Sequence, residues 1–136
     1  MAGARLLRQS SARRRRSVAV EHDDVMAWVT GYEVAWRASN AAAVKELFTE
    51  DARYRPSPYK PAEVGHGAIQ EFWCDDDGKS FEVRAELVAV DGHRAVVRVD
   101  VDYLGSSPEQ YRNLWVLDFA EDGRVREFEE WTQAPG

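Results

Sequence analysis

The sequence predicts an α+β domain in which a curved antiparallel sheet is covered on its concave face by three helices. The strongest observation is the segment 111–131, where bulky apolar residues recur at the period of two that places them on one face of a strand. Glu121-Asp122-Gly123 divides this segment with a hairpin turn signal. A second pair of alternating segments precedes it, and helical patterns occupy the first half of the chain. Two long strands with so many large apolar groups on one face need a cover, and those helices are the available elements.

The first helix is predicted to follow Glu21, with His22-Asp23-Asp24 at its start. Five apolar residues recur at three- and four-residue spacings, which place them on one helical stripe: Val25, Trp28, Val29, Tyr32 and Trp36. His22-Asp23-Asp24 puts acidic side chains at the helix start, where the helix dipole favours them. The stripe must therefore pack against an apolar surface.

A second helix and a short strand follow. Ser39 or Asn40 can cap this helix. Its buried stripe is predicted to consist of Val44, Leu47 and Phe48. Residues 49–51 end the helix, and residues 52–55 are predicted to form the strand.

A loop then leads to the third helix. Three of the five prolines lie in residues 55–67, which excludes regular structure there. In the helix that follows, Ile69, Phe72 and Trp73 share one face.

Four antiparallel strands complete the predicted order. The first alternates over residues 81–89, and Asp91-Gly92 is a hairpin signal directly after it. The second places its apolar residues on one face: Ala95, Val97, Val99, Val101 and Tyr103. Residues 111–119 and 125–131 then form the last two strands.

Length and composition describe one domain with its own core. The chain has 136 residues, of which 44% are hydrophobic and 31% are charged, as in ordinary globular proteins. Cys74 is the only cysteine, so no intramolecular disulfide can form. No apolar run approaches the roughly 18 residues that a membrane-spanning helix requires. We therefore expect a cytoplasmic protein without a membrane partner.

Residues 1–20 differ from the rest in charge. They contain six arginines and no acid, so residues 21–136 carry a formal charge of −12, against −6 for the whole chain. The first 20 residues are predicted to be either a disordered basic tail or an extension from a start codon placed too early. Because an acidic domain repels phosphate backbones, we expect no nucleic-acid partner for the folded domain.

Three segments of the sequence, and the predicted order of helices and strands, resemble those of a known superfamily. They are LFTEDARY at 47–54, GHGAIQEFW at 65–73 and FAEDGRVREFEEW at 119–131. Together they resemble the SnoaL-like branch of the nuclear transport factor 2-like superfamily, with a domain expected at residues 21–133. The resemblance implies a cone-shaped half-barrel with a deep pocket, and a homodimer through the outer sheet face. It implies the fold more than a reaction, because functions differ widely among the superfamily's members.

Ketosteroid isomerases of this superfamily provide one test. The resemblance places Tyr32 where they have an oxyanion-stabilising Tyr on the first helix. Pro56 stands where they have the catalytic base, and Trp115 stands where they have a second, aspartate donor. Without the base, abstraction of a proton beside a carbonyl has no evident agent.

Limonene epoxide hydrolases provide another test. Arg98-Val99-Asp100, Tyr54 and Glu130 resemble their Arg-x-Asp pair, their tyrosine and their second acid, although Pro56 stands in place of a water-holding Asn. Strand alternation argues against this match, because inward Arg98 and Asp100 would turn the valines of the same strand outward. We therefore predict that Arg98 and Asp100 face solvent as a charge pair.

The pocket is predicted to lie between the first helix and the last hairpin. Its predicted lining is Tyr32, Trp36, Tyr54, Trp73, Asn113, Trp115, Leu117, Phe128 and Glu130, the last two placed there by the resemblance. Trp28 is predicted to belong to the core, whereas Trp36 and Trp73 fit either the core or a ligand platform.

Glu130 has two predicted environments. If it faces the pocket, its carboxyl group must either bind a polar partner or have a raised pKa and be protonated. Both states are useful for acid or base chemistry. If the sequence FEEW twists at the sheet edge, Glu130 lies in water.

No motif indicates a cofactor or a metal. The three histidines lie in separate segments without metal-ligand spacing, and no phosphate loop, dinucleotide fingerprint or nucleophile elbow is present.

The first functional hypothesis is a binding protein for a small, mostly apolar or aromatic ligand. The alternative is a cofactor-free isomerase, dehydratase or hydrolase for a cyclic metabolite, with Glu130 as acid or base and Tyr32 or Tyr54 as donor. A structural dimer with a filled pocket is a third possibility.

Overall fold

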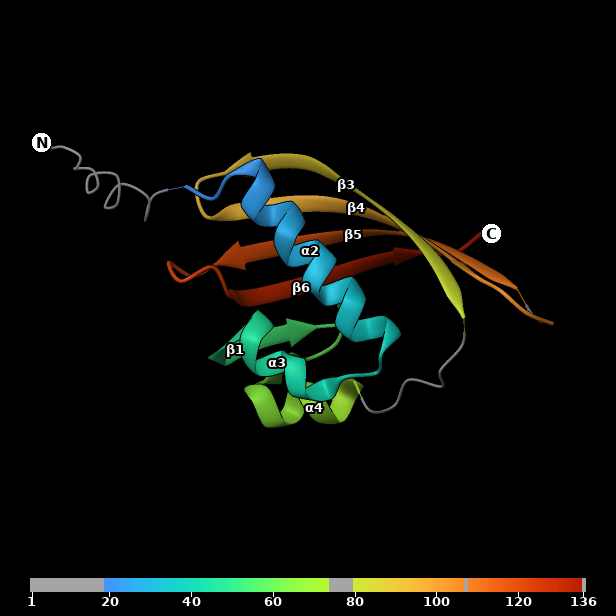
Figure 1. Cartoon of the computed structure of the whole chain (residues 1–136), viewed down its shortest axis with the longest axis horizontal. Coiled ribbons are helices and arrows are strands. Elements are labelled where there is room, and N and C mark those ends of the chain that lie inside the picture. Colours follow the sequence, from blue (N-terminus) through green and yellow to red (C-terminus); the bar gives the residue numbers. More distant parts are fainter. Residues whose placement is uncertain (1–18, 74–79, 107, 136) are drawn as a thin grey trace, which may run out of the picture.

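The computed structural model describes residues 19–73, 80–106 and 108–135. Within these ranges the elements are, in chain order, α2 (His22–Arg37), the 3₁₀ helix η2 (Ala41–Ala43), α3 (Val44–Leu47), β1 (Phe48–Arg55), β2 (Glu63–Val64), α4 (His66–Trp73), β3 (Phe81–Asp91), β4 (Arg94–Tyr103), β5 (Glu109–Phe119) and β6 (Val125–Gln133). The predicted α+β fold, a curved sheet with three α-helices, is confirmed (Figure 1).

The six strands form one open sheet in the order β2-β1-β6-β5-β4-β3. All neighbouring strands are antiparallel except β1 and β6, which run parallel with Tyr54 opposite Phe128. The sheet is thus mixed, whereas the sequence predicted antiparallel pairing. Hairpin turns fix the relative direction of β3, β4, β5 and β6. Since no turn joins β1 to β6, the local sequence does not determine whether these two strands run parallel or antiparallel.

Helix α2 crosses the concave face of the sheet, while α3 and α4 lie beside β1 (Figure 1). The predicted stripe of α2 is largely buried, with Val25, Trp28, Val29 and Tyr32 each at most 7% exposed. Trp28 is central to this packing, and its Nε1 donates a hydrogen bond to the Leu47 carbonyl (2.8 Å). The prediction that Trp28 belongs to the core is confirmed.

The second predicted helix is shorter than its pattern indicated. It consists of η2 and a single turn of α3, and Phe48 begins β1 instead of ending the helix. Neither Ser39 nor Asn40 caps it with a side chain; Ser39 instead has a positive φ of 51°. Phe48 is fully buried and lies opposite Val125 of β6. A short apolar run fits a helix and a strand equally well, and sheet pairing decided between them.

The predicted alternation of β4 is confirmed. Ala95, Val97, Val99 and Val101 are at most 2% exposed and face the helices. The hairpin before β4 turns at Gly92, whose φ is 62°. This strand therefore forms part of the floor of the core.

A bulge changes the face that β6 presents. Asp118 pairs with Glu127 and Phe119 pairs with Val125, so Arg126 is an extra residue on β6. As a result Val125 and Phe128 are both buried although they are three residues apart. Strict alternation from Val125 would have turned Phe128 and Glu130 outward.

The chain before α2 is tied to the sheet by the Val20 amide, which donates to the Gly92 carbonyl (2.9 Å). The predicted basic tail at residues 1–20 falls outside the described residues, except for its last two positions. No helix among the described residues is long and apolar enough to span a membrane.

Candidate functional site

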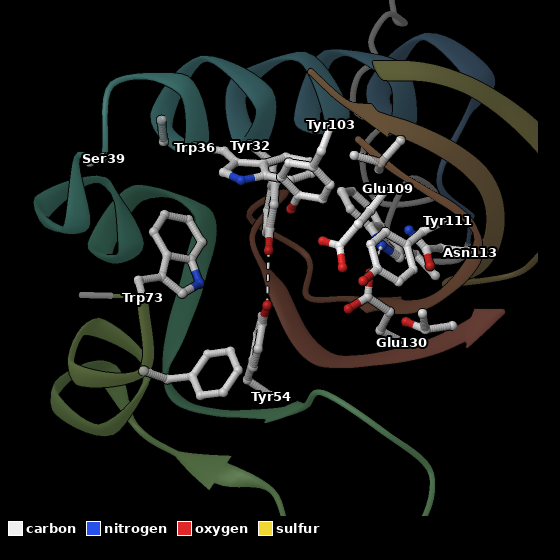
Figure 2. Close-up of a pocket in the computed structure, with 15 residues that line it drawn as sticks. Tyr32, Trp36, Ser39, Tyr54, Trp73, Tyr103, Glu109, Tyr111, Asn113 and Glu130 are labelled. Carbon is white, nitrogen blue, oxygen red and sulfur yellow. Dashed lines mark hydrogen bonds between the residues drawn. The ribbon is translucent and has the colours of Figure 1, made fainter. Parts of the chain in front are cut away.

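A cavity of about 460 Å³ lies between α2, α4 and the concave face of the sheet. Its lining consists of Tyr32, Ala35, Trp36, Ser39, Tyr54, Phe72, Trp73, Val101, Tyr103, Glu109, Tyr111, Asn113, Trp115, Glu130 and Thr132 (Figure 2). A volume of this size matches the range in which small-molecule sites occur. The predicted pocket between the first helix and the last hairpin is therefore present as a space, and α4 forms a further wall.

Two tyrosine hydroxyl groups meet at one wall of the cavity. Tyr32 of α2 and Tyr54 of β1 share a hydrogen bond of 2.9 Å, and both side chains are buried (Figure 2). The ring of Phe128 stacks parallel to both tyrosine rings. The centroid distances are 5.7 Å to Tyr32 and 4.5 Å to Tyr54. The aromatic stacking holds the two hydroxyl groups in a fixed position.

Burial is the main reason that the pKa of each tyrosine is raised above its ordinary value. The charge of Glu130 adds to the effect at both phenols. Both tyrosines therefore stay neutral across the physiological range and can serve as hydrogen-bond donors. In the pair, one hydroxyl donates to the other, so one O–H proton remains for a ligand oxygen.

Glu130 is half-buried and lines the cavity. The bulge on β6 turns it inward opposite Trp115, whose Nε1 donates to its Oε2 (3.0 Å). Burial raises the pKa of this carboxyl group, and the hydrogen bond from Trp115 lowers the pKa in part. Of the two environments that the sequence allowed, the structure therefore has the inward one.

Within the described part of the chain, two buried polar atoms at the cavity have no hydrogen-bond partner. They are Oδ1 of Asn113, on a side chain that is 6% exposed, and Nε1 of Trp73. The Trp73 indole N–H is not within hydrogen-bond geometry of a described acceptor, but it lies near enough to the Tyr54 hydroxyl to lower the pKa of that phenol against the larger effect of burial. Buried polar groups are rarely left unpaired, so these atoms are available to a ligand or to water.

Seven of the nine predicted pocket residues line the cavity: Tyr32, Trp36, Tyr54, Trp73, Asn113, Trp115 and Glu130. Leu117 and Phe128 do not line it; both are at most 1% exposed and lie within the core. The rings of Tyr32, Tyr54 and Trp115 pack against Phe128 and separate it from the cavity, and Leu117 lies opposite Phe128 on β5.

The sequence-based prediction missed several residues of the cavity. Among them are Tyr103, Glu109, Tyr111 and Thr132; Glu109 and Tyr111 lie near Asn113 and Glu130 (Figure 2), and Thr132 is opposite Asn113 in the sheet. The period of two contained the signal, because Tyr111 and Glu109 precede Asn113 by two and four positions, and Thr132 follows Glu130 by two.

The prediction that Arg98 and Asp100 face outward is confirmed. Arg98 donates to Asp100 along β4 at 3.2 Å, and Asp100 also pairs with Arg84 and Arg112 on the neighbouring strands. Neither lines the cavity, because the alternate residue Val99 points inward and is fully buried. The constellation that resembled epoxide hydrolases is therefore divided between two faces of the sheet. Pro56 is also absent from the lining.

The described residues that line the cavity include two carboxylates, Glu109 and Glu130, and no Lys, Arg or His. Over the same part of the chain, no group of three or more His, Cys, Asp or Glu side chains is arranged to hold a metal ion. Cys74 and the acidic residues after it lie outside the described residues.

The fold is similar to that of several solved proteins. One is SalBIII, described as an epoxide hydrolase/cyclase-like enzyme in pyran ring formation in the polyether salinomycin, with 16% identity and a TM-score of 0.68 over 79% of this chain and 89% of that chain. An M. tuberculosis LEH-like epoxide hydrolase has 17% identity and a TM-score of 0.65, with coverage of 82% and 84% respectively. A ketosteroid isomerase-like protein from Erwinia carotovora atroseptica has 20% identity and a TM-score of 0.61, with coverage of 81% and 94%. At these identities the likeness establishes the fold alone.

No curated protein matches the chain at a significant level. Residues 28–128, however, match the family of SnoaL-like domains. This range runs from the middle of α2 to the buried Phe128 of β6 and so includes most of the cavity. The chain therefore belongs to the SnoaL-like domain family of the nuclear transport factor 2-like superfamily.

Proposed function

We propose that this protein binds a small, flat and mostly apolar molecule in the cavity beneath α2. The observation that carries the proposal is the aromatic lining of a space of about 460 Å³, together with buried polar atoms that have no hydrogen-bond partner among the described residues. Rings provide large contact areas with little loss of side-chain freedom, and a few polar groups orient the ligand.

The walls of the cavity are rigid enough to be preformed. Trp36 stacks on Phe81 with centroids 4.1 Å apart, and Trp73 meets Tyr32 edge to face at 5.0 Å. These contacts fix both indoles before a ligand arrives, which reduces the conformational entropy lost on binding.

A neutral bicyclic probe tests the proposal. Calorimetric titration with naphthaleneethanol should show one site per chain. Thr132→Trp should weaken this binding at least tenfold, because the new indole would narrow the cavity from its exposed end. Gln133→Trp is the matched control, since the next residue along β6 does not line the cavity. Equal binding of naphthaleneethanol by Thr132→Trp would contradict the proposal, as would failure of the wild-type protein to bind naphthaleneethanol or its amine and carboxylate analogues.

A second candidate function is catalysis without a cofactor, as an isomerase, dehydratase or hydrolase acting on a cyclic metabolite. The raised pKa of Glu130, in a cavity shared with the Tyr32–Tyr54 pair, favours it. The similar structures include an epoxide hydrolase/cyclase-like enzyme and a ketosteroid isomerase-like protein, which makes these reaction types reasonable starting points.

In this reaction Glu130 would transfer the proton. Trp115 holds its Oε2, so the other carboxyl oxygen is the one that can exchange a proton with the substrate. The free O–H of the tyrosine pair would then donate to a substrate oxygen on which negative charge develops.

Turnover separates the two candidates. Cyclohexene oxide and a β,γ-unsaturated cyclohexenone test hydrolysis and isomerisation, with products measured by chromatography. The catalytic candidate requires product from wild type and from Glu129→Gln, whose side chain is not part of the cavity, and loss of product in folded Glu130→Gln. Undiminished turnover by Glu130→Gln would exclude Glu130 as the acid or base.

A further inference from the structure

We propose that the ligand of the cavity carries a protonated amine, which is held between Glu130 and Asn113 while its ring lies against the aromatic walls. This inference rests on the proposed binding function and names the chemical class of the ligand. Four features of the cavity support it.

Asn113 presents an acceptor that nothing in the described structure satisfies. Its side chain is 6% exposed, it lines the cavity, and its Oδ1 makes no hydrogen bond. A ligand that occupies this end of the cavity must therefore bring a donor if the atom is to be paired.

Glu130 lies within reach of the same ligand group. In the register of β5 and β6, Asn113 is opposite Thr132 and Trp115 is opposite Glu130, so Asn113 and Glu130 are diagonal neighbours on the inner face. Figure 2 shows both side chains in the same part of the cavity. An ammonium group has three donors, so it can reach both acceptors at once.

The charge of the cavity favours a cation. None of its described lining residues is basic, while Glu109 and Glu130 are acidic. Residues 21–136 also carry a formal charge of −12. A carboxylate or phosphate ligand would enter without a positive partner among these residues, whereas an ammonium group would meet opposite charge.

Aromatic faces border the polar end. The rings of Tyr103 and Tyr111 are nearly perpendicular, at 85°, with centroids 5.9 Å apart. Both line the cavity with Trp115. Perpendicular aromatic walls beside a carboxylate are an arrangement that binds ammonium groups through cation–π attraction.

Binding of a cation should be coupled to the protonation of Glu130. Burial raises the pKa of this carboxyl group, and a bound ammonium group would lower it again. The other titratable side chains that line the cavity are Tyr32 of α2, Tyr54 of β1, Tyr103 of β4, and Glu109 and Tyr111 of β5. No cationic side chain among these described groups opposes the coupling, so amine binding should release a proton.

Three ligands with one ring system test the inference. Naphthaleneethylamine, naphthaleneethanol and naphthaleneacetate differ mainly in the charge of the side chain, and calorimetry measures the affinity of each. The amine should bind about tenfold more tightly than the alcohol, and the carboxylate more weakly than the alcohol. An alcohol that binds as tightly as the amine would overturn the inference and leave the proposed function standing. If none of the three binds, both fail.

Two variants test whether Glu130 causes the preference for the amine, and two buffers test whether amine binding releases a proton. Glu130→Gln should lose the preference for amine over alcohol, whereas Glu129→Gln should keep it, because Glu129 pairs with Arg55 outside the cavity. If Glu130→Gln does not fold, the wild-type protein decides the matter. Its apparent enthalpy of amine binding, measured about one pH unit above the ordinary glutamate pKa, should differ between acetate and MES buffers, which both take up protons at this pH but with different enthalpies, because a proton is released. Equal enthalpies in the two buffers would overturn the inference.

Discussion

The carboxyl group of Glu130 is half-buried in the cavity, where it accepts a hydrogen bond from the neutral indole of Trp115. Because burial raises its pKa in the folded state, the protonated form stabilises the fold relative to the ionised form. This stabilisation is fully present below the unfolded-state pKa of 4.5 and is lost as the pH rises through the folded-state value. We expect Glu130→Gln to have a higher Tm than wild type at neutral pH, with a difference that shrinks towards about pH 4.

Glu129→Gln is the control for this residue. Its side chain pairs with Arg55 at 3.5 Å and is not part of the cavity, so its removal should not reproduce the same dependence on pH. Thermal unfolding of the three proteins across the pH range provides the measurement. If the Tm difference between wild type and Glu130→Gln were the same at every pH, Glu130 would not be desolvated in the folded protein.

At the scale of the elements, two glycines in different backbone conformations should respond oppositely to alanine. Gly123, in the turn between β5 and β6, has a φ of 91°, a conformation that L-residues rarely adopt. Gly67, within α4, has no neighbouring atom within 4 Å of an added Cβ. We expect Gly123→Ala to lower the free energy of unfolding by about 1 kcal/mol and Gly67→Ala to raise it by about 0.5–1 kcal/mol.

Urea denaturation measures both changes, and the pair serves as its own control, since each variant adds one methyl group to open space. The reason for the opposite signs is purely conformational. Equal effects of the two substitutions would show that the β5–β6 turn can rearrange without loss of stability.

At the scale of the whole molecule, the outer face of the sheet carries exposed apolar groups. Leu114 of β5 is 42% exposed and Trp131 of β6 is 52% exposed, and both border a shallow groove that also contains Val96 and Val116. Arginine and acidic side chains both line the same groove, so a second copy related by two-fold symmetry can be placed with opposite charges facing each other. We propose that this face forms a homodimer.

A substitution in the groove tests the proposed dimer through the molecular mass of the protein in solution. Leu114→Arg should convert the dimer to a monomer, because it places a charge within the apolar contact. Val34→Arg on α2 is the control, since Val34 is 63% exposed but does not border the groove. Light scattering after size-exclusion chromatography measures both. A monomeric wild-type protein would exclude the proposed interface at the concentration used.

The sequence by itself determined which residues of β4 and β5 face inward. Val97, Val99, Asn113 and Trp115 alternate with polar or half-exposed neighbours, and strand geometry converts that alternation into two faces without further information. The stripe of α2 was predictable for the same reason, with the helical period in place of the strand period.

Tertiary structure alone decided the position of Glu130 and the depth of the cavity. The extra residue at Arg126 reverses the alternation of β6, so a count from Val125 points Glu130 to the wrong side. The parallel pairing of β1 with β6 places Phe128 opposite Tyr54, where its ring stacks on Tyr54. Both features depend on how distant strands align, whereas periodicity describes only each segment by itself.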